Sequence, residues 1–152
     1  MSDYLQLKSL RKLLKGEKVE RAAATLPQTA TGDLFNVVTG RVAITQIIGE
    51  VTVEIENQAT NLRLVATPTV GTVSDLCVNL DIDADAVGTM YGITGDPTDA
   101  LQDDNSVMPG QEVAVIVKEG AVQAITDESS TGEIRWTVFY VPIDDGAYIE
   151  VA

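Results

Sequence analysis

The stretch "FNVVTGRVAITQIIGEVTVEIENQ", residues 35–58, is rich in Val, Ile and Thr, with glycines at positions 40 and 49. In its second half, apolar Val51, Val53 and Ile55 alternate with polar or acidic side chains. A period of two residues is typical of a β-strand with one buried and one solvated face. The stretch therefore predicts β-strands that are interrupted or ended at the two glycines.

The same period recurs near the C-terminus, where "EIRWTVFYVP" occupies residues 133–142. One face of this strand would carry Ile134, Trp136, Val138 and Tyr140. We expect Trp136 to belong to the core. The opposite face carries Phe139 and Val141, which are too apolar for a fully solvated surface. We expect a second layer or a neighbouring subunit to cover them.

Turn signals recur about every ten residues along the rest of the chain, which is typical of sandwiches and barrels. The run "EVAVIVKEGAVQAIT", residues 112–126, predicts a hairpin that turns at Glu119 and Gly120. The whole pattern predicts an all-β fold, an antiparallel β-sandwich or barrel of jelly-roll type with about eight or nine strands. This domain is expected to span residues 25–152. An N-terminal arm, helical or extended, would occupy residues 1–24, and the small polar residues 22–32 an extended linker.

The arm contains "DYLQLKSLRKLLKG", residues 3–16, in which leucines and cations fall on opposite sides of a helical wheel. An isolated helix of about 13 residues is marginal, so its leucines need a surface to bury against. That surface would be the chain's own domain, another subunit or, as for any basic amphipathic helix, a lipid interface. The expected partner-binding residues are Leu7, Lys8, Leu10, Arg11, Lys12, Leu13, Leu14 and Lys15.

Charge divides the chain in the same way. Residues 1–21 carry six cations and three acids, whereas residues 22–152 carry four cations and twenty acids. A body this acidic repels nucleic acid, so no nucleic-acid partner is expected. The basic arm is suited instead to an acidic surface on a partner.

The inventory of side chains argues against an enzyme. The chain contains no histidine, which is the commonest general base and zinc ligand. Its one cysteine, Cys77, lies among strand-like neighbours and is expected to be buried and inert. No glycine-rich phosphate motif and no long apolar run is present, so we expect no cofactor and no membrane span.

The segment "DIDADA", residues 81–86, places carboxylates at every second position. It fails as a calcium loop, because the sixth position is Ala86 where glycine is needed and the twelfth is Gly92 where glutamate is needed. On a strand, the carboxylates would lie roughly 6.6 Å apart along one face, which is too splayed for one ion. We expect no metal site. Asp81, Asp83 and Asp85 are weak candidate ligands for a cation site that would be completed by another subunit.

Three phrases resemble a known class of protein. They are "RAAATLPQTATGDLFNVVTGRVAITQIIGEV" (residues 21–51), "DLCVNLDIDADAVGTMYGITG" (75–95) and "GEIRWTVFYVPIDDGAYIEVA" (132–152). In these phrases and in their overall pattern of residues, residues 21–152 resemble the capsid decoration (cement) proteins of tailed bacteriophages. The resemblance includes no catalytic signature and carries no site residues.

The resemblance implies a β-rich, often trimeric module that binds outside a capsid where capsomers meet. The expected partners are the major capsid protein and further copies of the chain, and the expected location is the capsid surface of the virion after synthesis in the bacterial cytoplasm. Two alternatives remain within the non-enzymatic class: another virion role, such as a head-fibre base or tail component, and a small cation- or ligand-binding β-barrel. A hydrolase using the three aspartates is a third alternative, but it lacks an aromatic cleft in the sequence.

Overall fold

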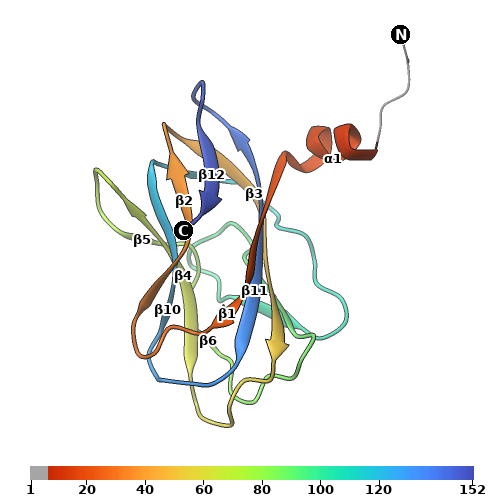
Figure 1. The fold of residues 1–152 in the computed structure, drawn as a ribbon, viewed down its shortest axis with the longest axis vertical. Helices are drawn as coiled ribbons and strands as arrows, with labels where there is room; N and C mark the ends of the chain where they lie inside the picture. Colours follow the sequence, from red (N-terminus) through yellow and green to blue (C-terminus); the bar gives the residue numbers. More distant parts are fainter. Residues whose placement is uncertain (1–6) are drawn as a thin grey trace.

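The computed structural model describes the backbone of residues 7–152 and the side chains in that range except those of Leu7, Lys8 and Arg11. The chain forms two antiparallel β-sheets, which face one another, and one helix, α1 (Leu7–Lys15), which extends away from them (Figure 1). The predicted all-β sandwich is therefore confirmed. No helix in the described part of the chain has the length and apolar character needed to cross a membrane.

Sheet A contains, in spatial order, β1 (Glu17–Thr25), β11 (Glu133–Pro142), β3 (Val42–Val53), β7 (Met90–Gly92) and β8 (Gln102–Asp104), with β9 (Val115–Val117) also paired with β3. Sheet B contains β12 (Tyr148–Val151), β2 (Thr31–Val38), β10 (Gly120–Thr126), β4 (Asn61–Pro68) and β5 (Ser74–Asp75), with β6 (Leu80–Asp81) also paired with β4. The described residues thus hold twelve strands rather than eight or nine, and five of them, β5 to β9, have only two or three residues each.

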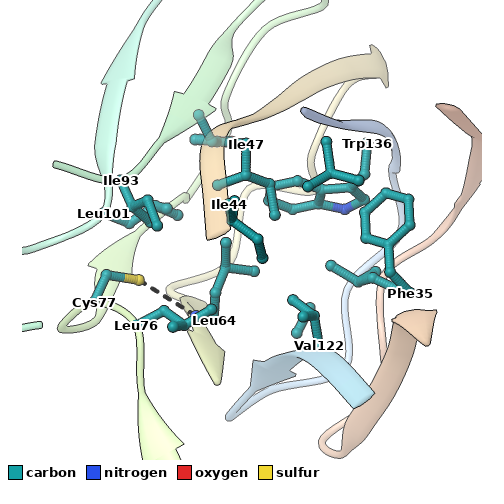
Figure 2. Close-up of a cluster of buried hydrophobic side chains, with 14 of the residues drawn as sticks. Phe35, Ile44, Ile47, Leu64, Leu76, Cys77, Ile93, Leu101, Val122 and Trp136 are labelled. Carbon is teal, nitrogen blue, oxygen red and sulfur yellow. Dashed lines mark hydrogen bonds between the residues drawn. The ribbon is translucent and has the colours of Figure 1, made fainter. Parts of the chain in front are cut away.

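The core lies between the sheets, and both supply it. In Figure 2, Ile44 and Trp136 of sheet A face Phe35, Leu64 and Val122 of sheet B. All five are at most 2% exposed, and burying each large apolar side chain contributes about 1.5–3 kcal/mol. Burial alternates along β11 as the sequence predicts, which confirms that the side chain of Trp136 is in the core.

Gly49 does not interrupt or end a strand, as the sequence had suggested it would. It lies inside β3, directly opposite Trp136 on β11. A Cβ at Gly49 would lie 2.7 Å from the indole Cζ3, so only glycine leaves room for the ring. Gly40, by contrast, does lie in the turn between β2 and β3, with a φ of 138°.

Two further strand predictions are wrong in detail. Val53 was grouped with Val51 and Ile55, yet its side chain is 48% exposed because β3 ends there. The predicted hairpin at Glu119 and Gly120 is a crossing between sheets: β9 pairs with β3 in sheet A, whereas β10 pairs with β2 and β4 in sheet B.

The N-terminal region also differs from the expectation. Residues 17–25 form β1, the edge strand of sheet A, so the boundary expected at residue 24 lies within a strand. The extended linker expected over residues 22–32 is instead the end of β1, a connection through Pro27, and the start of β2. Within residues 7–25, the helical part is α1, which meets β1 at Gly16.

Candidate functional site

The three candidate metal ligands lie at a turn rather than along a strand. β6 ends at Asp81, and the chain reverses through Ala84, whose φ is 54°. The Asp81 Oδ1 accepts hydrogen bonds from the backbone N–H groups of Thr60 (3.2 Å) and Asp83 (3.1 Å). This carboxylate therefore stabilises the turn, which the alternating sequence pattern did not predict.

Asp85 has a different partner. Its Oδ2 accepts a hydrogen bond of 2.5 Å from the hydroxyl of Tyr91, whose side chain is fully buried. Burial raises the pKa of the Asp85 carboxyl above its ordinary value, and the Tyr91 hydrogen bond opposes that rise. Within residues 7–152, no three potential ligands are gathered to hold a metal ion. The structure thus gives Asp81 and Asp85 separate structural contacts and does not bring the three carboxylates together.

Cys77 is only 1% exposed, and its Sγ accepts a hydrogen bond of 3.3 Å from the Leu64 N–H (Figure 2). Burial raises the pKa of the thiol to about 11, which leaves it protonated near neutral pH. The expectation that this cysteine is buried is confirmed.

Helix α1 contains all eight predicted partner-binding residues. Leu10 is 41% exposed, and Leu13 and Leu14 are each 72% exposed. The side chains of Leu7, Lys8 and Arg11 lie outside the described residues. Among the described side chains, the leucine stripe is not buried against the chain's own sandwich.

The base of α1 is nonetheless firmly attached. Gly16 has a φ of 90°, and a Cβ there would overlap the Tyr140 carbonyl oxygen of β11. The Thr45 hydroxyl of β3 donates a hydrogen bond of 2.5 Å to the Lys15 carbonyl oxygen. An ion pair of 2.8 Å joins Lys12 to Glu17 at the start of β1. These contacts fix the direction in which α1 leaves the sandwich.

Beside this attachment, the outer face of sheet A carries an apolar groove of about 400 Å³. We call it the sheet A groove; it is lined by Lys15, Gln46, Ile48, Met90, Met108, Pro109, Gly110 and Phe139. The sequence singled out two of these lining residues, Lys15 as part of the arm and Phe139 through its place on the outer face of its strand. The other apolar walls come from β3, β7 and a loop, and no local pattern brings these segments together.

Comparisons with known proteins add little. No protein-family model and no curated protein matches this chain. Among solved structures, the chain is similar to one titled "Structure of infectious bursal disease virus Gx strain", with 12% identity over 88% of this chain and a TM-score of 0.20. The similar part spans about a third of that other chain, 33%. A TM-score this low supports no argument about fold or function.

Proposed function

We propose that this chain is a non-enzymatic structural protein of a phage particle, which binds the outside of the capsid and stabilises the shell. Its partners in this proposal are the major capsid protein and further copies of itself. The observation that carries the proposal is α1, an amphipathic helix anchored at its base with Leu13 and Leu14 each 72% exposed. An apolar stripe held in water by a fixed anchor is suited to burial against a neighbouring subunit.

The sheet order supports this assignment at the level of architecture. The chain alternates between the sheets as it passes from β1 to β4, and the orders β1-β11-β3-β7 and β2-β10-β4-β5 pair early strands with late ones. We propose that this double sheet is a jelly roll, an architecture found in viral capsid and lectin domains. Because one architecture hosts many functions, the weight of the proposal rests on α1 and on the phrases that resemble decoration proteins.

The mechanism follows from mass action. A protein that binds only the assembled lattice stabilises it by about 2.7 kcal/mol per site at a free concentration of 100 times its Kd. Linking copies together multiplies their attachment points and raises avidity without new contacts to the shell. The acidic body then faces solvent, where its charge favours solubility.

The test compares particles assembled with the full chain, with residues 16–152, and without the protein. We expect surface density in electron-microscopy maps only for the full chain, together with a higher melting temperature of those particles. Truncation before Gly16 should leave the sandwich folded, with a free energy of unfolding within about 1 kcal/mol of the full chain, because exposed leucines contribute little to it. Deletion of residues 1–20 is unsuitable, since it removes four residues of β1.

A matched pair of variants separates attachment from folding. The double variant Leu13→Ser, Leu14→Ser should lose particle binding, whereas Val70→Ser, which alters an equally exposed valine between β4 and β5, should retain it. Density at a tail rather than on the shell would replace this proposal with another virion role. Unchanged binding of the leucine variant would remove α1 from the mechanism.

A further inference from the structure

The sheet A groove is built to receive apolar side chains. Its apolar residues are Ile48 on β3, Met90 on β7, Phe139 on β11, and Met108 with Pro109 from the loop after β8. Methionines adapt their shape to what they contact and are frequent at binding surfaces. Of the described residues of α1, the last, Lys15, belongs to the groove lining, and none of the leucines does.

The chain's own helix is held away from this groove. Gly16 is locked against the Tyr140 carbonyl, and the Lys15 carbonyl accepts from Thr45. The Lys12–Glu17 ion pair further sets the angle between helix and strand. Figure 1 shows α1 leading away from the sandwich, so these contacts would have to break before its leucines reached the groove of the same chain.

Charge indicates which partner fits the groove. In the sheet register, Glu50 on β3 and Asp104 on β8 are the direct neighbours of Met90 on either side. Paired residues share one face of a sheet, so two carboxylates flank the groove at Met90, whereas Lys18 is the neighbour of Phe139 and Lys15 belongs to the lining. Glu50 forms an ion pair with Arg135 at 3.1 Å, whereas the Asp104 carboxylate accepts hydrogen bonds from backbone N–H groups, among them those of Ser106 and Val107. The part of the groove at Met90 therefore complements the cations of a basic amphipathic segment, while its apolar floor complements the segment's apolar side.

The body of a second copy does not meet that requirement, since residues 22–152 carry twenty acids and four cations. The arm of a second copy does, because its leucines and its cations lie on opposite sides of one short helix. Leucines directed at the groove floor would leave the cations free to approach the two carboxylates beside Met90 and the surrounding acidic body.

We infer that α1 of one chain binds in the sheet A groove of a second copy. This inference deepens the proposed function, on which it rests for the role of α1 as a contact element, by naming the neighbouring subunit. Each chain carries both the helix and the groove, so two chains related by a two-fold axis exchange helices reciprocally, and a cyclic assembly exchanges them head to tail. The contact that links copies on a shell is thus the contact that buries the leucines.

Disulfide trapping tests the exchange directly. One preparation carries Leu13→Cys and a second, lengthened by a tag, carries Met90→Cys; the native Cys77 is buried and does not interfere. After mixing and mild oxidation, we expect a mixed disulfide between tagged and untagged chains. Val70→Cys in the tagged chain is the matched control, because Val70 is 80% exposed and lies outside the groove lining, and it should give little mixed product.

Sedimentation of unmodified chains gives an independent measurement. Leu13→Ser with Leu14→Ser, and separately Phe139→Ser, should each raise the dissociation constant of the oligomer about tenfold or more, as expected for losing buried apolar contacts. Circular dichroism and melting would show whether Phe139→Ser still folds, and the leucine variant alters only exposed side chains of α1.

The outcomes separate this inference from the proposed function. A third preparation carries Leu13→Cys and Met90→Cys in one chain. A disulfide within that chain, without mixed product from the two single variants, would mean that α1 folds onto its own groove. A strictly monomeric full chain that still decorates particles would overturn the exchange and leave the decoration role intact. Exchange in a protein that binds no particle would support the interface and remove the decoration role.

Discussion

At the scale of single residues, the most informative contact is the hydrogen bond between Tyr91 and Asp85. The side chain of Tyr91 is buried in the core, and its ring centroid lies 6.5 Å from that of Trp136. Its hydroxyl donates a hydrogen bond to Asp85 in the turn that follows β6. A buried hydroxyl without a partner is costly, so the carboxylate of Asp85 has a structural role as the acceptor for Tyr91. Asp81, Asp83 and Asp103 lie close enough to oppose the charge on Asp85.

This contact predicts a pH effect on stability. Because the pKa of Asp85 is raised above its ordinary 3.8, the folded chain holds this proton more tightly than the unfolded chain. The stabilisation from Asp85 is therefore present below that value and is lost as the pH rises through the folded pKa. Asp85→Asn, whose amide oxygen still accepts from Tyr91, should gain stability relative to the wild type over the same rise.

Urea unfolding at several pH values between about 4 and 7 measures the difference in free energy of unfolding between the two chains. The matched control is Asp145→Asn, which removes an exposed charge that is not among those acting on Asp85 and leaves the Tyr91 bond intact. A pH-independent difference for Asp85→Asn would show that this carboxyl titrates alike in folded and unfolded chains.

At the scale of elements, the junction between α1 and β1 determines how the helix is presented. Nine residues of helix have little stability of their own, so orientation depends on what holds the last turn. Gly16 supplies the left-handed turn and the close approach to Tyr140 that no other residue could combine. A flexible tether would spread the helix over many directions and weaken a specific contact.

A glycine pair tests this junction. Gly16→Ala and Gly88→Ala both place a side chain at a positive φ, 90° and 94°, which costs roughly 1–2 kcal/mol. Only Gly16→Ala adds a clash with backbone, since the nearest atom to a Cβ at Gly88 is 3.7 Å away. Chemical unfolding should therefore show a larger loss of stability for Gly16→Ala. Equal losses would mean that the junction yields easily and does not fix the helix.

At the scale of the whole molecule, the sandwich is closed by pairings between distant parts of the chain. β1 pairs with β11, which follows it by more than 100 residues, and β2 pairs with β10 and β12. Both termini of the domain are thereby incorporated into sheets, and neither sheet is complete until the last strands are in place. Such a fold depends on contacts between segments that are far apart in the sequence, and these contacts form late during folding.

We therefore expect slow folding. Chains dominated by non-local strand pairing refold in about milliseconds to seconds. The single tryptophan, Trp136, is buried on β11 between β1 and β3, so its fluorescence reports the closure of sheet A in a stopped-flow experiment. Microsecond recovery of the whole fluorescence change would contradict this expectation.

Local pattern was sufficient for part of the candidate site. The amphipathic character of α1, the buried Cys77 and the unusual outer face at Phe139 were all predicted from residue types and spacing. The groove itself could not be predicted, because Ile48, Met90 and Met108 become neighbours only through strand pairing. The turn at Ala84 was concealed because alternation of aspartates looks the same in a strand and in a turn that uses them as hydrogen-bond acceptors.

By itself, then, the sequence determined the all-β class, the inward face of β11 and the difference in charge between residues 1–21 and 22–152, since periodicity and charge are local properties. Only the tertiary structure decided that residues 17–25 are a strand, because this segment has no buried residue and is defined by its pairing with β11. The tertiary structure also decided that Glu119 and Gly120 join the two sheets. It showed that Gly49 leaves the space that the Trp136 ring occupies. Each of these depends on a partner remote in the chain, and local periodicity carries no information about which remote segment that partner is.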